Sequence, residues 1–559
     1  MRLGLVIGLA VAAGACSASS KSTPSSSGSG DSVTVFVTTE VKGQIEPCGC
    51  TSDPMGDLAR TAALVAGARR DGAVVVLDSG SLLYTELTPK PAQVAQEQLK
   101  ADLLAAAFRD HLHAAAVGLG PYDLAAGPAN VRPARQAANV GGAGVAIEAP
   151  KVIEAGGVKI GVFGVVAPEL VAPHGVTATD PAPAAKAAVA SLRKGGAEIV
   201  VGLVHMDRAG VKQLVRDVPG IDVAVVGADA PEPDRVERTP DRVGDTWLVQ
   251  SANRGQVITR LDITARGAGP LSDAIGEARA EQEIAAIDER LERIRADIAK
   301  LDSDPNADPD FVAMQNADLT DLERRRAELV ESPLRVPAKG SYFVMSQVPI
   351  KKMLPCSEAI VKQKAEYDEA VGKANLAAAK STPVPPAPEG TAGYAGMSEC
   401  GYCHKEAVEF WKQTKHASAW KTLADAGKQY NLECVYCHAT GFGAPGGSNL
   451  AVLAEPPEDE SLRDAQCEVC HGPASLHIDA DGKEQPSSLV LRTPKDTCVV
   501  CHNALHSDTF DYEAYLRDMT GPGHGEAFRK SLSDGPTGHE LRAAALKKAG
   551  SKVGAGCPK

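Results

Sequence analysis

The sequence predicts a multidomain protein in which a layered α/β part is followed by a helical hairpin and a mainly α-helical C-terminal part. The first observation is length, because 559 residues exceed what one hydrophobic core usually serves. The second is an alternation of β-rich apolar runs with Ala-rich helical stretches in the first half of the chain. The third is a change beyond residue 396, where short helical stretches and turns carry closely spaced Cys and His.

Composition excludes one broad class of function. The net charge is -13 and no basic face is concentrated in the chain, so we expect no nucleic-acid binding. Apolar residues make up 44% of the chain, yet beyond the N-terminus no apolar run is long enough to span a bilayer. We therefore expect the mature chain to be soluble.

Residues 1–16 have the pattern of a secretory signal peptide, with a positive residue, an apolar stretch and a small-residue cleavage site. The site ends in Cys16 and resembles the lipobox of bacterial lipoproteins, although Ala13 stands where Leu is usual. Cys16 would then be the lipidated first residue, and the Ser/Gly-rich stretch 17–31 a flexible tether. The alternative is an ordinary signal peptide cut near Ala15. We expect a membrane-anchored lipoprotein on the periplasmic side of the cell envelope, in the inner or the outer membrane.

The α/β part covers residues 32–269. Its expected strands are short apolar runs at 33–37, 74–77, 158–166, 199–204, 223–226 and 247–250. Because Ala-rich helical stretches separate these runs, we expect a layered domain with much of its sheet buried.

Residues 270–332 are predicted to form a helical hairpin. Apolar residues recur there at heptad spacing among charged ones, at Ile284, Ile287, Leu291, Ile294, Ile298 and Leu301. A turn at 302–309 contains two prolines, and a second charged helix returns with Leu319, Leu322 and Leu329. The apolar faces of two antiparallel helices can pack against each other, so we prefer packing between the two helices to a partner-binding role.

The chain beyond the hairpin divides into a connection, a second main domain and a tail. Residues 333–360 are expected to contribute one returning strand and a connection. Residues 361–395 are expected to form a helix and a Pro-rich linker. The second main domain covers 396–530, and a polar tail covers 531–559.

The second domain contains four copies of the pattern C-x-x-C-H. Their cysteines are Cys400, Cys403, Cys434, Cys437, Cys467, Cys470, Cys498 and Cys501, and their histidines are His404, His438, His471 and His502. Two cysteines three residues apart can reach both vinyl groups of one haem, and the adjacent histidine then lies under the iron. The sequence therefore predicts four covalent haems c, with these histidines as proximal iron ligands.

Structural zinc is the competing interpretation, because paired C-x-x-C motifs also build tetrahedral thiolate sites. A zinc ribbon does not require a histidine after every second cysteine, whereas all four copies have one here. Export also favours haem, because attachment takes place outside the cytoplasm, where free thiols tend toward disulfides. The domain is so short for four haems that they would supply much of its core.

Candidate sixth ligands are the histidines outside the motifs, namely His416, His477, His506 and His524. Their number fits a fully bis-histidine cytochrome. Each could instead be a surface or propionate-bonding residue. His506 is the least certain because it follows His502 so closely, and His539 is left unassigned.

Three segments of this domain carry a family resemblance. They are 400–420, with Trp411 and Lys415-His416-Ala417; 467–477, with C-x-x-C-H-G-P-A-S-x-H; and 521–525, with G-P-G-H-G. They resemble the tetrahaem cytochrome c family linked to hydroxylamine oxidation and multihaem nitrite reduction. The resemblance implies that His416, His477 and His524 are distal ligands on haems other than those of their nearest motif, in closely packed pairs. It implies low potentials, although one subset of the family keeps a five-coordinate haem that binds small molecules.

The α/β part resembles the calcineurin-like metallophosphoesterases, especially exported five-prime nucleotidases, through 38–47, 56–60, 74–80, 203–205 and 222–227. That family holds two metals with a D-x-H, an Asp in a G-D turn, an N-H pair and later histidines, which activate a water. Here Glu40 and Lys42 stand at the D-x-H. Ser81 follows Gly80 where the second Asp belongs, and 121–122 read Pro-Tyr instead of Asn-His.

The later histidines are also missing. Residues 227–230 read G-A-D-A where a G-H-x-H run would stand, which leaves His205 as the one retained histidine. We therefore favour a degenerate, non-hydrolytic domain with His205 as a hydrogen-bonded strand-end residue and Asp78 as a structural one. His111 and His113 lie two apart on an expected helix, on different faces, so no metal site is expected there.

Four further cysteines remain. A disulfide between Cys356 and either Cys48 or Cys50 is plausible in an oxidising compartment and would pin the returning strand to the sheet. A C-x-C redox or metal site is the alternative for Cys48 and Cys50. Cys557 lies in the tail, and its position in the sequence indicates no particular role.

The leading interpretation is an electron carrier tethered by lipid, with the α/β part as a docking or spacing scaffold. Its expected partners are redox proteins such as a quinol oxidase, other cytochromes or a reductase, and the membrane through the anchor. The alternatives are a metal-dependent phosphohydrolase or nucleotidase fused to a cytochrome, a haem-based reductase of a nitrogen oxide, and sensory or structural haems.

Overall fold

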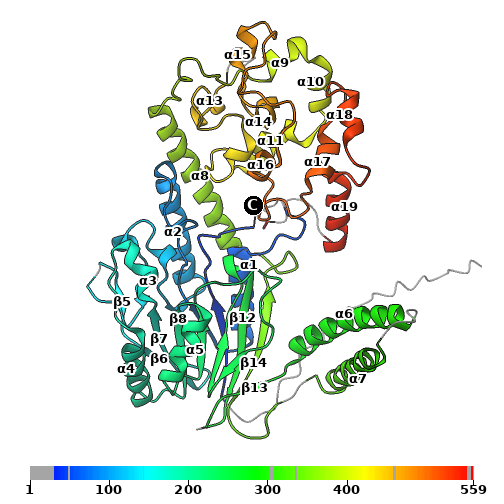
Figure 1. Cartoon of the computed structure of the whole chain (residues 1–559). Helices are drawn as coiled ribbons and strands as arrows, with labels where there is room; N and C mark the ends of the chain where they lie inside the picture. The colour runs from blue at the N-terminus through cyan, green and yellow to red at the C-terminus, as the bar shows by residue number, and fades with distance from the viewer. Residues whose placement is uncertain are drawn as a thin grey trace, which may run out of the picture.

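The computed structural model describes residues 31–47, 51–142, 144–267, 269–302, 308–333, 336–456, 461–550 and 556–557. Figure 1 shows a layered α/β part below and a helical part above. Helix α8 (Glu358–Ser381) packs against α2 (Val94–Asp110) in the first part and against α13 (Leu450–Ala454) in the second. Within the described ranges, no helix combines the length and the apolar character that a membrane crossing requires.

Two six-stranded sheets form the centre of the α/β part. The first has the order β13 (Ser272–Ala274), β14 (Tyr342–Pro349), β12 (Val257–Ala265), β1 (Asp31–Thr38), β2 (Val74–Asp78) and β3 (Ala114–Val117). The second has the order β10 (Asp241–Val243), β11 (Thr246–Val249), β9 (Val223–Val226), β8 (Ile199–His205), β7 (Val158–Val166) and β6 (Lys151–Ala155). Every strand expected from the sequence is present, which confirms the α/β interpretation.

The sheets face each other across a shared apolar core. Valines, leucines and isoleucines of both sheets form one buried cluster, with Val35 and Leu77 from the first sheet and Val201 from the second. A second cluster lies between the first sheet and helices α1 (Leu58–Asp71), α2 and α8. A third lies between the second sheet and helices α4 (Pro181–Lys194) and α5 (Arg208–Asp217). The strands are apolar on both faces because each sheet is covered on both sides.

The remaining short elements of this part lie at its edges. They are the parallel pair β4 (Arg135–Gln136) and β5 (Ile147–Glu148), and helix α3 (Pro168–Val171).

The predicted helical hairpin is present as α6 (Glu277–Asp302) and α7 (Pro309–Glu331), which extend away from the sheets in Figure 1. Leu291, Ile294 and Leu329 are buried where the two helices pack. Charged pairs flank this seam, including Arg326 with Asp288 at 2.5 Å. The heptad spacing therefore serves the packing of the two helices against each other.

The C-terminal part consists of short helices. They are α9 (Met397–Cys403), α10 (Lys405–Trp411), α11 (Ala419–Ala426), α12 (Val435–His438), α13, α14 (Cys467–His471), α15 (Ser475–Asp479), α16 (Lys495–Val499), α17 (Tyr512–Met519), α18 (Glu526–Ser531) and α19 (Gly538–Ala549). The stretch expected as a polar tail thus contains α19, which packs on α17. Its first turn is held by a hydrogen bond from the His539 backbone N–H to the Asp518 carboxylate, at 2.6 Å.

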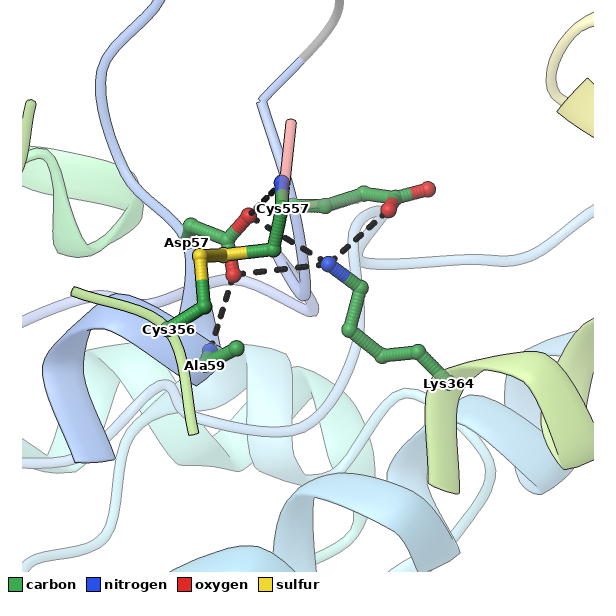
Figure 2. The surroundings of a disulfide bond; sticks show 6 residues. Asp57, Ala59, Cys356, Lys364 and Cys557 are labelled. Carbon is green, nitrogen blue, oxygen red and sulfur yellow. Dashed lines mark hydrogen bonds and ion pairs between the residues drawn. A yellow bond between two sulfur atoms is a disulfide. The ribbon is translucent and has the colours of Figure 1, made fainter. Parts of the chain in front are cut away.

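The expected disulfide partner of Cys356 was wrong. Figure 2 shows that Cys356 is bonded to Cys557, 201 residues later. The expected partners, Cys48 and Cys50, lie outside the described residues, and so does Cys16. The Cys557 backbone N–H also donates to the Asp57 carboxylate at 3.4 Å. Sequence spacing could not identify this pair, because it joins a position after the last strand of the first sheet to the far end of the chain.

Candidate functional site

The four C-x-x-C-H motifs line one cavity of about 3460 Å³ in the C-terminal part. All four motif histidines and seven of the eight motif cysteines border it, whereas Cys403 is exposed. The histidines singled out as candidate distal ligands, His416, His477, His506 and His524, border the same cavity, and so does His539. The structure therefore brings every predicted haem-binding residue except Cys403 to one cavity.

Short helices position the motifs. The first motif ends α9 at Cys403, the second forms α12, the third is the whole of α14, and the fourth begins in α16. Residues three apart on a helix share a face, so α14 presents both thiols of the third motif to the cavity. In the second and fourth motifs one cysteine lies outside the helix.

Hydrogen bonds orient the motif histidines. The Nδ1 atoms of His438 and His471 lie 2.5 Å from the Ala419 carbonyl oxygen and 2.7 Å from the Val490 carbonyl oxygen. A carbonyl can only accept, so Nδ1 carries the proton and Nε2 keeps its lone pair. His502 makes the corresponding contact to a hydroxyl, with Nδ1 3.1 Å from Ser507 Oγ. Such a contact fixes the tautomer and orientation of a metal-binding imidazole.

Histidines from distant segments approach the motif histidines. The rings of His416 and His502 have centroids 6.0 Å apart, although His416 follows the first motif and His502 closes the fourth. His524 is an electrostatic neighbour of His471 in the third motif.

Two candidate ligands remain. His506 neighbours His438 of the second motif and is thus placed beside a motif other than the one it follows in sequence. His477 lines the cavity and is held by a hydrogen bond from its Nδ1 to the Glu484 carbonyl oxygen.

The electrostatics of the cavity keep several imidazoles neutral. Burial lowers the pKa of His416, of His438 and of His524 below the ordinary value of 6.5. Burial, followed by the neighbouring His416 and Arg542, lowers the pKa of His502 to about 4. Only a neutral imidazole offers a lone pair to a metal, so these histidines are in the protonation state that iron ligation requires.

The donor set fits covalent haem. The Cys400 thiol is an electrostatic neighbour of the Cys467 thiol, and the Cys437 thiol of the Cys501 thiol, so the first motif lies beside the third and the second beside the fourth. The Nδ1 atom of His524 is buried, and none of the described residues provides it with a hydrogen-bond partner. Thiols, neutral imidazoles and one buried nitrogen without a hydrogen-bond partner surround a large cavity. Such a lining matches a prosthetic group that has an apolar body and polar substituents.

Two residues that the sequence did not single out hold the first and third motifs together. The buried carboxylate of Glu468 accepts hydrogen bonds from the backbone N–H groups of Gly396 at 2.8 Å and Ala474 at 2.9 Å. Gln466 accepts from the Met397 N–H at 2.7 Å. Glu468 occupies a variable position inside its motif, which gives no sign of this role in the sequence.

The second candidate site is the place where a metallophosphoesterase would hold its metals. Glu40 accepts a hydrogen bond from the Ala230 backbone N–H at 2.8 Å and pairs with the Lys42 ammonium at 3.2 Å. Lys42 also lies over the ring of Tyr122, 4.6 Å from its centroid. An ammonium group therefore stands among these side chains, and a lysine cannot ligate a cation while it is charged.

His205 and Ser81 fill the centre of this region. His205, the last residue of β8, is fully buried, with Nε2 3.2 Å from Ser81 Oγ and Nδ1 2.9 Å from the Ser79 carbonyl oxygen. A Cβ added at Gly120 would lie 2.1 Å from Ser81 Oγ, so the backbone there closes over the pair. His205 is thus a hydrogen-bonded strand-end residue, as expected.

Two buried carboxylates complete this network. Asp78 accepts from the Thr38 hydroxyl at 2.6 Å and from the Gly80 N–H at 2.9 Å. Asp123, which the sequence did not single out, pairs with the buried Arg135 at 3.0 Å. Across the described ranges, no group of three or more His, Cys, Asp or Glu side chains is placed to hold a metal ion.

His111 and His113 have separate surroundings, but the expected helix ends before both of them, at Asp110. His111 Nε2 contacts the Gln363 side chain at 3.0 Å, and His113 is exposed and contacts the Arg109 carbonyl oxygen.

Comparison with known proteins separates the two parts. Residues 399–472 match the family model "Cytochrome c554 and c-prime". Cytochrome c-554 of Nitrosomonas europaea is 29% identical to this chain over 141 residues, which cover 20% of this chain and 58% of that protein. This chain therefore spans less than two thirds of that relative.

The chain is also similar to solved structures of hydrolases. A 5'-nucleotidase precursor from Thermus thermophilus has a TM-score of 0.40 at 16% identity and covers 61% of this chain and 59% of its own. The T. thermophilus sulfate thiohydrolase SoxB has a TM-score of 0.40 at 14% identity, covering 64% of this chain and 62% of its own. Residues 399–472 of this chain are thus similar to the cytochrome c554 and c-prime family, and the same chain carries a layered α/β part.

Proposed function

We propose that the chain is an exported, lipid-anchored cytochrome that carries four covalent haems c and transfers electrons between redox proteins. The observation that carries this proposal is the convergence of all four motif histidines and four further histidines on one cavity. A c-type cytochrome needs thiols for attachment and neutral imidazoles for ligation, and these line the same space. Bound haems would supply the reversible one-electron chemistry.

The residues of the chain divide this task. The eight motif cysteines would hold the haems, and His404, His438, His471 and His502 would be the proximal ligands. The contacts favour His416 as distal ligand opposite His502, His524 opposite His471 and His506 opposite His438. His477 is then the candidate for the first motif. Paired motifs place neighbouring haems close together, which suits transfer of electrons along the chain.

Two features support export and anchoring. Disulfides persist in oxidising compartments, so the bond between Cys356 and Cys557 favours a location outside the cytoplasm. Cys16 would carry the lipid, with 17–31 as a tether. The partners would be redox proteins of the cell envelope, such as a quinol oxidase, another cytochrome or a reductase.

We infer that the α/β part does not hydrolyse phosphoesters. The support is the Lys42 ammonium beside Glu40 and the buried Ser81 and His205, which contact each other at the centre of the region. Two metal ions would have to displace these packed side chains, and the region offers them one histidine as a ligand.

Redox titration of the purified holoprotein, followed by electron paramagnetic resonance, tests the electron-transfer proposal. We expect four haems that resist acid extraction, four one-electron potentials and low-spin iron at each. Fewer covalent haems, or failure to exchange electrons with a small cytochrome or a quinol oxidase, would contradict it. Metal-dependent hydrolysis of nitrophenyl phosphate or AMP would overturn the inference about the α/β part.

A further inference from the structure

One group of contacts between the two parts of the molecule holds the second motif. The chain just before Cys434 is held by α2 of the α/β part. The Gln96 amide donates to the Asn431 side chain at 2.8 Å and accepts from the Leu432 backbone N–H at 2.9 Å. One residue later, the Glu433 carboxylate accepts from the Lys100 ammonium at 2.7 Å. The second motif therefore begins on a backbone that the α/β part fixes in place.

This anchor is buried and charged. The Lys100 side chain is 2% exposed and also contacts Glu97 at 2.6 Å and the Thr85 hydroxyl at 2.6 Å. Burial by itself lowers the pKa of Lys100, but the carboxylates of Glu433 and Glu97 outweigh it and raise that pKa. Lys100 is thus a permanent cation that is itself buried, and leaving a buried cation without its carboxylate partners is far more costly than breaking a surface pair.

The wall of the cavity beside the second motif also comes from outside the haem domain. Lys90, in the α/β part, lies 5.0 Å from the ring centroid of Tyr436, which stands between the two motif cysteines. Tyr367 of α8 borders the cavity, and its electrostatic neighbours include Glu433 and Cys434. Both residues precede 399–472, the segment that matches the cytochrome family.

The buried hydroxyl of Tyr367 has no hydrogen-bond partner among the described residues. The residue is 5% exposed. Burial, followed by the nearby Glu433 and Glu97 carboxylates, raises the pKa of Tyr367, so the group is a neutral O–H donor. A buried hydroxyl without a partner destabilises the fold, and a hydrogen bond to a bound group would remove this cost.

Tyr84 shows what a purely structural tyrosine looks like in this chain. It is fully buried, and none of the described residues partners its hydroxyl either. Tyr84 does not border the cavity, whereas Tyr367 does. The difference between the two residues is therefore access to the space in which the second haem would lie.

We propose that the second haem occupies a site shared between the two parts of the molecule, and that the Tyr367 hydroxyl donates a hydrogen bond to one of its propionate carboxylates. The inference rests on the proposed cytochrome function. In this arrangement Gln96 and Lys100 position the attachment segment, while Tyr367 contacts the prosthetic group. The α/β part then has a role that does not depend on phosphoester chemistry, because it completes one of the four haem sites.

A donor to a propionate offsets part of its negative charge, which favours the reduced iron and raises the potential. Replacing Tyr367 with Phe removes only the hydroxyl. The holoprotein of Tyr367→Phe should therefore retain all four covalent haems, with one midpoint potential lowered and three unchanged. Tyr84→Phe is the matched control and should leave all four unchanged.

The affected haem can be assigned by spectroscopy. Cys434→Ala removes one thioether of the second haem while Cys437 and His438 still hold it, so its resonance marks that haem. The resonance that shifts in Tyr367→Phe should be the same one. Four unchanged potentials in Tyr367→Phe, a uniform shift of all four, or a shift of another haem would overturn the shared site. Absence of covalent haem in the unsubstituted protein would instead refute the proposed function.

Discussion

The imidazoles of His416 and His502 border the same space, with ring centroids 6.0 Å apart and planes inclined by 47°. They belong to segments that follow the first motif and close the fourth, so the fold pairs residues that no local pattern connects. Burial lowers the pKa of each, which leaves both neutral. This relationship identifies His416 as the candidate sixth ligand of the fourth haem.

Replacing His416 with Met should raise one haem potential. An axial Met favours the reduced iron more than His does, so one of the four potentials should move upward while three stay in place. Redox titration of the holoprotein provides the measurement. His113→Met, at an exposed histidine of the α/β part, is the control. Four unaltered potentials would show that His416 does not bind iron.

Loss of the disulfide between Cys356 and Cys557 should destabilise the protein. The bond closes a loop with a sequence separation of 201 residues, and removing a crosslink of this kind costs about 2–5 kcal/mol. We expect Cys557→Ser to lower the free energy of unfolding in denaturant titrations by this amount. The double variant with Cys356→Ser should be no less stable than Cys557→Ser alone. An additive loss in the double variant would mean that the two cysteines act separately.

Acid should weaken the contact between the two parts through Glu46. Burial raises the pKa of this carboxyl, but Lys428 and Lys364 outweigh burial and lower it from 4.5 to about 2. Because the folded-state pKa is depressed, the stabilisation is complete above pH 4.5 and is lost as the pH falls toward 2. The difference corresponds to about 3 kcal/mol.

Glu46→Gln should therefore unfold at a lower temperature than the unsubstituted protein at pH 6. The difference between the two unfolding temperatures should narrow as the pH approaches 2. Thermal unfolding across this range measures it. Glu369→Gln removes an exposed pair with Lys373 on α8 and is the control, which should have little effect on the unfolding temperature. A gap that does not change with pH would refute the role of Glu46.

Asp78 should have the opposite pH dependence. Burial, with a smaller contribution from the neighbouring Asp123, raises its pKa from 3.8 to about 7. The folded state therefore favours the protonated carboxyl, and stability is lost as the pH rises from 3.8 through 7. Asp78→Asn keeps an acceptor and a donor in place and should be more stable than the unsubstituted protein at pH 8, by about 1–4 kcal/mol.

The gain in Asp78→Asn should shrink below pH 5, where the native carboxyl is neutral. Denaturant titrations at both pH values measure the difference. Asp207→Asn, at the N-terminus of α5, is a control that should show no such reversal. Equal effects of Asp78→Asn at pH 5 and pH 8 would mean that the native carboxyl is charged at both.

Much of the fold could be predicted because its signals are local. Val-rich runs form strands wherever both faces of a sheet are covered, and β8 is buried along its whole length. The third C-x-x-C-H motif forms a single helical turn that needs no distant partner to present its thiols. The heptad of α6 likewise needs only the adjacent α7.

Other features depend on contacts across many residues. Cys557 could not be paired by inspection, because any of several cysteines could reach Cys356 until the chain is folded. Lys100 and Glu433 are ordinary charged residues in the sequence, yet 333 positions apart they form an ion pair in which the ammonium group is buried. Tyr367 stands on an amphipathic helix, where an aromatic residue is usually core, and only the neighbouring cavity distinguishes it from Tyr84.

The sequence by itself determined that the chain has a layered α/β part and four C-x-x-C-H motifs, because strand burial and C-x-x-C-H spacing act over a few residues. Tertiary structure alone decided which histidine lies beside which motif, which cysteine bonds to Cys356 and which motif the α/β part contacts. The physical reason is that ligation, crosslinking and burial of charge depend on distances of a few ångströms between groups that the chain separates by tens to hundreds of residues.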